Sequence, residues 1–148
     1  SNTLKINPWE GTCKIEMTPQ GVIEVTTGTG DWWGGGLEIQ GGHGENLTAF
    51  SEGFLHFDIK GHPDLKFNIG FQTGDFLAGT QVNSGIGFGG KSPLKLTNQW
   101  KSYKLPIKLA DRNQRANLRD VTGLFYLKGD SPKQQQVFVK NIYYSKYE

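Results

Sequence analysis

The sequence predicts an all-β protein, an antiparallel β-sandwich or barrel that forms a single domain over residues 1–148. Two observations carry this prediction. Short segments in which apolar and polar residues alternate recur between clusters of Gly, Pro, Asn and Asp. Glycine is abundant, with 21 residues in the chain, and the apolar spacing of a helix is almost absent. We therefore expect eight or nine strands, at a pitch of roughly 8–12 residues.

The first part of the chain contains a predicted hairpin and a short strand. Residues 13–17 alternate, and a Pro-Gln-Gly turn at 19–21 leads into a second alternating run at 22–27. After a segment rich in Trp and Gly, residues 37–40 form another short run in which Leu and Ile point one way and Glu and Gln the other.

The clearest strands are residues 54–60 and 65–72, which a Gly-His-Pro-Asp turn connects. Burying each large apolar side chain of these runs contributes about 1.5–3 kcal/mol, so both are predicted to be core strands. The residues expected to face inward are Leu55, Phe57, Ile59, Leu65, Phe67, Ile69 and Phe71.

Residues 73–93 differ from the strands because they combine many glycines with isolated apolar residues and several amides. Their spacing fits a long loop and one short strand, and long loops on rigid sheets often carry function. Residues 103–109 alternate again, and Pro106 in this run indicates an edge strand or a bulge because proline has no N–H to donate.

The last part of the chain contains two further strands. Residues 111–120 are polar and are predicted to form a loop or one short helical turn, and residues 121–128 read as a strand. The final strand covers residues 137–145, where the alternation slips by one position at Lys140-Asn141. A slip of one residue predicts a β-bulge.

Composition excludes several classes of protein. The net charge is +2, from 16 basic and 14 acidic residues spread without long blocks, and no concentrated basic face for nucleic acid is indicated before the mildly basic final third. No apolar run approaches the roughly 20 residues of a membrane span. The single cysteine, Cys13, excludes an intrachain disulfide, and its place in an alternating run predicts a small buried core residue.

The adjacent tryptophans Trp32 and Trp33 cannot both enter one core from one strand, because neighbouring strand residues face opposite ways. Alternation with Leu37 and Ile39 predicts that Trp33 faces inward and Trp32 is exposed; a bulge among glycines 34–36 would reverse this. An exposed indole is suited to stacking on a sugar ring or on another protein. The glycines either allow a ligand close to the backbone or form a turn or bulge.

The side chains opposite the apolar positions form a polar and aromatic sheet face. Fixed amides and carboxylates can pair with sugar hydroxyls, but the same pattern also fits the solvated outer face of an ordinary sandwich. The residues of this face are Glu38, Gln40, His56, Asp58, Asn68, Gln72, Tyr126 and Lys128.

Catalytic motifs are weak, and no catalytic or metal-binding residue is predicted. A glycosidase needs two carboxylates about 5–10 Å apart, but the acidic residues here do not form a paired array, and no Gly-x-Ser-x-Gly motif occurs. His43, His56 and His62 lack metal-site spacing and are expected to be structural or solvated. His56 and Asp58 share a strand face and are the best enzymatic alternative.

Five segments resemble non-catalytic carbohydrate-binding modules with the galactose-binding-like jelly-roll fold, of the kind appended to bacterial β-glucanases. The matching segments are residues 33–36, 46–50, 53–60, 100–106 and 137–142. They are mainly structural motifs, so they support the fold more than the ligand. The resemblance implies a jelly-roll sandwich that is not itself an enzyme.

The resemblance also has implications for metal binding and location. Many such modules hold a structural calcium ion through acidic residues of the last and the N-terminal strands. Here the corresponding residue of the last strand is Asn141, so no cofactor is expected, and Glu10 and Glu16 are the remaining candidates for calcium ligands. A module of this kind is expected to be secreted or located at the cell surface or in the periplasm.

The leading hypothesis is a monomeric module that recognises a β-glucan, β-1,3-linked or of mixed linkage, and targets a covalently linked glycoside hydrolase to it. Trp32 or Trp33 would stack on a glucose ring, with Phe76 and Tyr126 as further platforms. The residues expected to hydrogen-bond hydroxyl groups are Glu38, Gln40, Gln72 and Gln81.

Two hypotheses from other classes remain open at this stage. One is a small jelly-roll glycan lyase or hydrolase with His56 and Asp58 near the chemistry. The other is a protein-interaction domain in which the tryptophan pair is the energetic centre of an interface.

Overall fold

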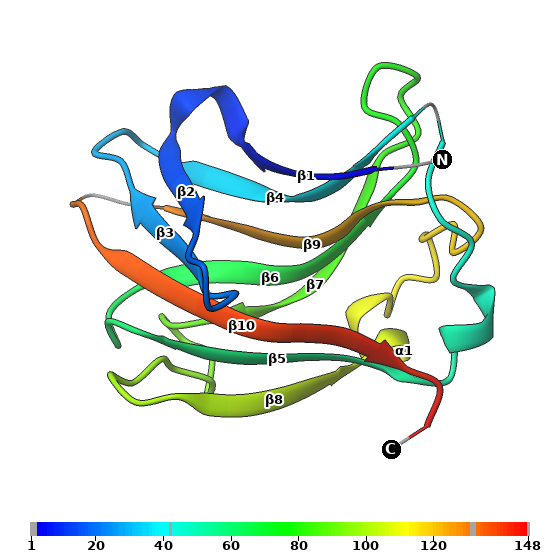
Figure 1. The fold of residues 1–148 in the computed structure, drawn as a ribbon. Helices are drawn as coiled ribbons and strands as arrows, with labels where there is room; N and C mark the ends of the chain where they lie inside the picture. Colours follow the sequence, from blue (N-terminus) through cyan, green and yellow to red (C-terminus); the bar gives the residue numbers. More distant parts are fainter. Residues whose placement is uncertain (1–2, 42, 131–132, 148) are drawn as a thin grey trace.

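The computed structural model describes residues 3–41, 43–130 and 133–147. Over these residues, ten strands form two antiparallel five-stranded sheets packed face to face (Figure 1). The predicted all-β sandwich is confirmed. Sheet A consists, in spatial order, of β1 (Thr3–Pro8), β4 (Trp33–Gln40), β9 (Val121–Asp130), β6 (Lys66–Thr73) and β7 (Val82–Phe88). Sheet B consists of β2 (Cys13–Met17), β3 (Ile23–Thr27), β10 (Gln136–Ser145), β5 (Phe54–Gly61) and β8 (Lys101–Pro106).

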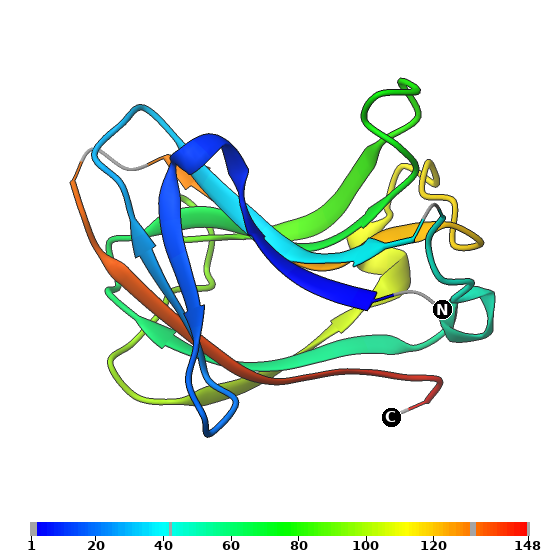
Figure 2. The same cartoon turned by 45° about the horizontal axis from the view of Figure 1, so that its top comes forward.

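The core lies between the two sheets, which are seen one above the other in Figure 2. All seven inward-facing residues predicted for the two clearest strands are buried, with at most 3% of their surface exposed. Aromatic side chains join the sheets: Phe67 and Phe88 stack at 5.3 Å between ring centroids, and Phe57 meets Phe125 edge-on at 5.7 Å. Period-two alternation therefore predicted the core correctly.

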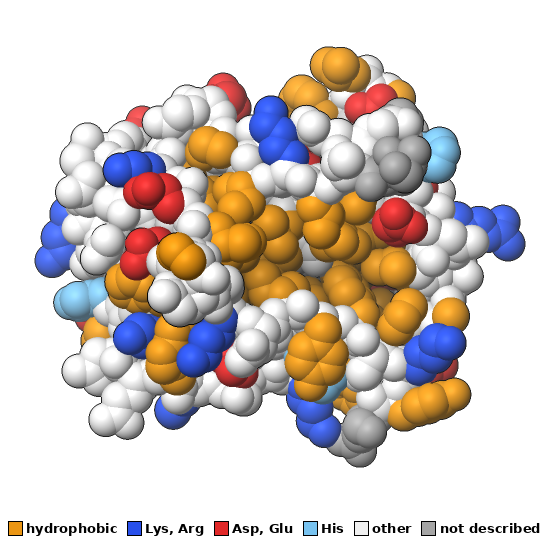
Figure 3. Space-filling view, in the orientation of Figure 1, with side chains coloured by type: hydrophobic (Ala, Val, Ile, Leu, Met, Phe, Trp, Pro, Cys, Tyr) orange, Lys and Arg blue, Asp and Glu red, His pale blue; other side chains and the backbone are white. Residues whose placement is uncertain are grey.

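Hydrophobic side chains also gather in a hollow at the centre of the face shown in Figure 3, and charged groups stand around it. Leu4, at the edge of sheet A, is 57% exposed, and Ile6 of the same strand is only partly buried. The sandwich is thus less tightly closed along its β1 edge than at its centre.

A predicted hairpin and a predicted bulge are both confirmed. The predicted hairpin forms as β2 and β3, which pair antiparallel from Cys13 opposite Thr27 to Met17 opposite Ile23. In β10 the register against β5 shifts between Lys140 and Tyr143, which is the bulge that the slipped alternation predicts.

The prediction that the strand around Pro106 continues to residue 109 was wrong. β8 is an edge strand that ends at Pro106, and the chain then turns into the short helix α1 (Ile107–Ala110). Pro106 still has an extended ψ of 131° and is the N-cap of α1, and its nitrogen carries no hydrogen to donate to the strand ladder. Ile107 and Ala110, three residues apart, are both buried on one side of this turn, so a helical spacing replaces the alternation.

Strand β1 has no counterpart among the predicted strands, although its sequence alternates. Leu4 and Ile6 alternate with Lys5 and Asn7, and the whole segment pairs antiparallel with β4 along the edge of sheet A. Two single-turn 3-10 helices, η1 (Trp9–Gly11) and η2 (Thr48–Phe50), complete the described elements.

The glycine triplet lies inside β4 and not in a turn. Trp33 begins the strand with none of its surface exposed, and its Nε1 donates a 3.3 Å hydrogen bond to the carbonyl oxygen of Asp130. The register of β4 against β9 shifts between Leu37 and Glu38, after the glycines, so alternation places Trp33 inward as predicted. Cys13 is half-buried, less than predicted, and its Sγ donates to the Gly34 carbonyl oxygen at 3.1 Å.

Candidate functional site

The outer face of sheet A is hollowed into a groove. Two adjoining cavities of about 1000 Å³ and 800 Å³ lie on this face, a volume typical of ligand sites. They share Trp32, Gln81, Asn83 and Lys128 in their walls, so they form one continuous depression across the strands. We call this depression the groove, the larger cavity its β7 end and the smaller cavity its β1 end.

The floor of the groove is deep because many outward-facing strand positions carry no side chain. A Cβ atom added to Gly34 would lie 2.6 Å from Cε3 of Trp9, and one added to Gly85 would lie 2.8 Å from the hydroxyl oxygen of Tyr126. Any larger residue at these positions would displace an aromatic ring of the site. The outward-facing glycines are Gly34, Gly36, Gly70, Gly85, Gly87 and Gly123.

Trp9 lies across the β1 end of the groove and was not predicted as a site residue. It follows β1 directly, in η1, where Glu10 and Gly11 have left-handed φ angles of 52° and 67° and turn the chain from sheet A towards sheet B. Its half-buried indole stacks over Tyr126 with 6.1 Å between centroids and 23° between planes. The alternation of β1 ending in Pro8-Trp9 is the signal that could have identified it.

Glu38 holds the Trp9 ring in place. Oε2 of Glu38 accepts a 2.7 Å hydrogen bond from Nε1 of Trp9, and its Oε1 accepts a 2.9 Å bond from Nδ2 of Asn7. At the other side, the backbone N–H and the hydroxyl of Thr12 donate to the Trp9 carbonyl oxygen at 3.0 and 2.7 Å. The indole is therefore oriented before any ligand arrives, which reduces the entropy lost on binding.

Trp32 is the second aromatic side chain of the groove. It is half-buried, lines both cavities, and has Nζ of Lys128 at 5.5 Å from its ring centroid, a cation–π contact. Its neighbour Trp33 has no exposed surface. The proposed role of Trp33 as a stacking platform is therefore corrected, because a side chain enclosed by the core has no face to offer a ligand.

Three further predicted residues line the groove. Gln72 is 4% exposed, and its Nε2 donates a 2.9 Å hydrogen bond to Oδ1 of Asn83 on the neighbouring strand. Gln81 is exposed in the wall that both cavities share. Phe76 is 75% exposed at the β1 end, on the loop that joins β6 to β7 and stands away from the sandwich in Figures 1 and 2.

Two other predicted residues occupy different places. Gln40 is exposed at the far end of β4 and is not among the residues that line the groove. Tyr126 belongs to the floor but is only 4% exposed beneath Trp9, and burial raises the pKa of its phenol to about 12. The prediction of Tyr126 as a stacking platform is corrected, because its ring lies beneath that of Trp9 and has no free face to offer a ligand.

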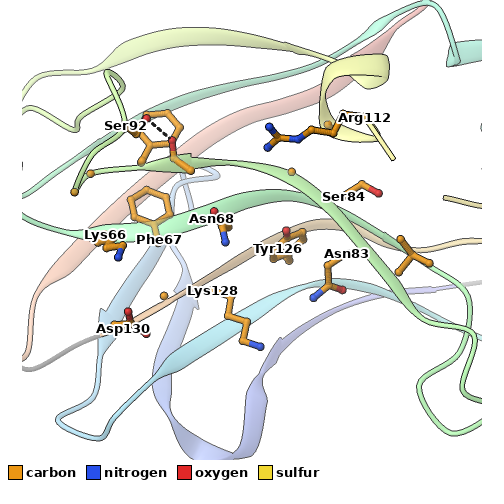
Figure 4. A pocket seen from close by; sticks show the side chains of 18 of the residues that line it. Lys66, Phe67, Asn68, Asn83, Ser84, Ser92, Arg112, Tyr126, Lys128 and Asp130 are labelled. Atoms are coloured by element: carbon orange, nitrogen blue, oxygen red, sulfur yellow. Dashed lines mark hydrogen bonds between the residues drawn. The ribbon is translucent and has the colours of Figure 1, made fainter. Parts of the chain in front are cut away.

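Figure 4 looks into the β7 end of the groove. Asn68, Asn83 and Tyr126 are seen along the floor strands, and Lys128 lies at the side of β4. Arg112 reaches in from the segment that follows α1. This end is therefore lined by amides and cations, while the β1 end has Trp9 and Phe76.

His56 and Asp58 lie on the outer face of sheet B, away from the groove. The His56 ring stacks on Tyr143 at 4.2 Å with 4° between planes, and its Nε2 is 2.7 Å from the Ser145 hydroxyl. Burial, helped by the charge of Lys104, lowers the pKa of His56. Asp58 accepts a 2.8 Å hydrogen bond from Asn141, so both side chains take part in contacts within the sheet.

The candidate calcium ligands each lie in a different place, with different neighbours. Glu16 forms an ion pair with Lys14 at 3.0 Å, while Glu10 lines the groove and Asn141 faces Asp58. Within residues 3–41, 43–130 and 133–147, no three His, Cys, Asp or Glu side chains are grouped as metal ligands would be. In the same ranges, no helix has the length and apolar character needed to cross a membrane.

The sequence profile of the family described as carbohydrate binding domain 30 matches residues 1–146. The chain belongs to this family. It is a non-catalytic carbohydrate-binding module, and its ligand is an oligosaccharide or polysaccharide. The groove on sheet A, with its aromatic rings and amides, is the part of the described structure that suits such a ligand.

Solved structures of similar fold include other modules of this kind. A family 30 carbohydrate-binding module has a TM-score of 0.73 and 19% identity, over 97% of this chain and 78% of the other. The family 30 module of a cellulosomal cellulase from Clostridium thermocellum has a TM-score of 0.69 and 22% identity, over 95% and 85%. A family 11 module from the same organism, in complex with a β-1,3-1,4-mixed-linked tetrasaccharide, has a TM-score of 0.54 and 18% identity, over 94% and 86%. Among curated proteins, none matches the chain.

Proposed function

We propose that this carbohydrate-binding module holds a β-glucan chain, β-1,3-linked or of mixed linkage, along the groove of sheet A. The observation that carries the proposal is the oriented indole of Trp9, which Glu38 holds over the glycine floor, together with a second half-buried indole, Trp32, that lines the same groove. The mixed-linked tetrasaccharide bound to the family 11 module of similar fold supports this ligand class.

The groove offers a β-glucan the two kinds of contact that it needs. The apolar faces of Trp9 and Trp32 pack against the C–H faces of glucose rings. Gln72 and Asn83, already hydrogen-bonded to each other, and the exposed Gln81 present further donors and acceptors to the hydroxyl groups. No bond is broken in this process, since the site contributes only binding.

The module acts, in this proposal, as a monomer that is secreted or held at the cell surface or in the periplasm. A glycoside hydrolase linked to it in the same polypeptide would be kept close to its substrate. Such a link raises the effective concentration of the polysaccharide at the catalytic domain without any new contact.

Affinity electrophoresis of the chain in gels that contain laminarin, lichenan, xylan or agarose tests the proposal. We expect retardation in laminarin or lichenan, and its loss in Trp9→Ala and Trp32→Ala. Trp100→Ala is the matched control, because Trp100 lies immediately before β8 of sheet B, under the amino groups of Lys60 and Lys140. Unchanged mobility in all four polymers would refute the proposal, as would equal losses in the control.

A further inference from the structure

The β7 end of the groove carries an excess of positive charge. Five cations and two carboxylates line it, which leaves three positive charges in excess, while the whole chain has a formal net charge of only +2. The cationic side chains are Lys66, Lys91, Arg112, Arg115 and Lys128. The carboxylates are Asp111 and Asp130.

These cations are not neutralised by the neighbouring carboxylates. In the part of the chain that the structure describes, none of the five lies within ion-pair distance of an acidic side chain. Oδ1 of Asp111 instead accepts 3.0 Å hydrogen bonds from the backbone N–H groups of Arg115 and Ala116, which shapes the loop after α1. Asp130 is opposite Lys66 in the sheet register without forming an ion pair with it.

The positions of the cations converge on one space. Lys66 and Lys128 come from neighbouring strands of sheet A, and Arg112 enters from the opposite wall, as Figure 4 shows. A concave surface that carries one sign of charge focuses its field on the space it encloses. A guanidinium group presents a planar fork of N–H donors that matches the oxygens of a carboxylate or a sulfate.

We propose that the β7 end of the groove binds an anionic group carried by the polysaccharide, a sulfate ester or a uronate carboxylate. This inference rests on the proposed function and extends it: neutral sugar rings stack at Trp9 and Trp32, and the charged substituent enters among Arg112, Lys66 and Lys128. The preferred ligand is then an acidic glycan rather than a neutral one.

Binding of three matched polymers measures this preference: laminarin, chemically sulfated laminarin and laminarin oxidised to carry carboxylates. We expect the native chain to bind one or both anionic polymers at least about tenfold more tightly than laminarin at low salt, with the advantage falling as ionic strength rises. The anionic polymer whose affinity exceeds that of laminarin by more identifies sulfate or carboxylate as the group recognised.

The variant that tests the site combines Arg112→Gln with Lys66→Gln, and we expect it to lose about tenfold in affinity for the preferred anionic polymer but none for laminarin. The matched control combines Lys14→Gln with Lys108→Gln. It removes the same charge from side chains that are 73% and 70% exposed and paired with Glu16 and Glu52 outside the groove.

The outcomes separate the two proposals. Binding to laminarin with no gain for either anionic polymer would overturn the acidic subsite and leave the proposed function standing. An equal loss in the control variant would also overturn it, since the charge effect would then not be local. Failure to bind any of the three polymers would overturn the acidic subsite, and it would overturn the proposed function as well if lichenan is not bound either.

Discussion

A single added methyl group tests whether the position of the Trp9 ring controls the affinity of the groove for glucan. In Gly34→Ala the new Cβ would stand 2.6 Å from Cε3 and 3.0 Å from Cζ3 of Trp9, and 3.3 Å from the Leu127 carbonyl oxygen. Carbon atoms pack best at about 3.5–4.0 Å, so the indole must rise by about 1 Å from the floor. The substitution therefore moves the platform without removing it.

The cost of this shift follows from the contacts that hold the ring. Raising the Trp9 ring strains its 2.7 Å hydrogen bond to Glu38 and its stacking on Tyr126. A hydrogen bond to a charged group contributes about 1.5–3 kcal/mol and an aromatic pair about 0.5–1.5 kcal/mol. Because the ring is half-exposed and keeps part of both contacts, we expect a loss in binding free energy of about 1–2 kcal/mol, a factor of roughly 5–30 in affinity.

Isothermal titration with a mixed-linkage glucan oligosaccharide measures this loss. Gly30→Ala is the matched control, since its Cβ would meet only the Trp32 carbonyl oxygen, at 4.0 Å. Folding stability of Gly34→Ala is expected to change by only about 1 kcal/mol, because alanine is favoured over glycine within a strand by about 0.5–1 kcal/mol. If Gly34→Ala binds as tightly as Gly30→Ala, the seating of Trp9 does not control affinity and the reasoning fails.

Three further predictions concern the residues around this platform. Glu38→Leu should weaken glucan binding about as much as Gly34→Ala, and Glu38→Gln should bind nearly normally because a glutamine oxygen can still accept from Trp9. Titration in a Trp9→Phe background, which keeps an aromatic ring but has no N–H to donate, should show no additional effect of Glu38→Leu, and an additive loss would argue for direct contact of Glu38 with the ligand. Tyr126, with a pKa raised to about 12, keeps a proton in the folded state that the unfolded state loses near pH 10, so folding stability should fall by up to about 1.4 kcal/mol per pH unit between these values. Urea titrations from pH 9 to 11.5 should show a smaller fall of stability with pH for Tyr126→Phe, and an equal fall would contradict the raised pKa of Tyr126. Trp33→Ala should lose about 3–5 kcal/mol of folding stability in urea denaturation, and a loss under 1 kcal/mol would be inconsistent with its complete burial.

Much of the fold could be predicted because alternation is a local property of the chain. The runs around Phe57 and Phe67 have one apolar face each, and that face can only be buried by a second sheet. The bulge near Asn141 was also predictable, since one extra residue shifts the pattern of the strand itself. The end of β8 was not, because the alternation runs on past Pro106 while the chain leaves the sheet to form α1.

The site was only partly predictable. The groove is lined by most of the residues that the sequence predicted for ligand binding: Trp32, Glu38, Gln72, Phe76, Gln81 and Tyr126. Their roles in binding stay predictions. Gln40 lies beyond the groove because its strand extends past the groove wall, which no local pattern reveals.

The sequence by itself determined the class of fold, the strands that build the core and the inward direction of Trp33, because each depends on the two-residue period of a strand. Only the tertiary structure decided what the glycines after Trp33 are for. Gly34 and Gly36 clear a floor on which Trp9, distant in sequence, lies against Tyr126 and hydrogen-bonds Glu38. These contacts join residues 29 to 117 positions apart, so they depend on strand order and register, which follow from the packing of the whole sandwich.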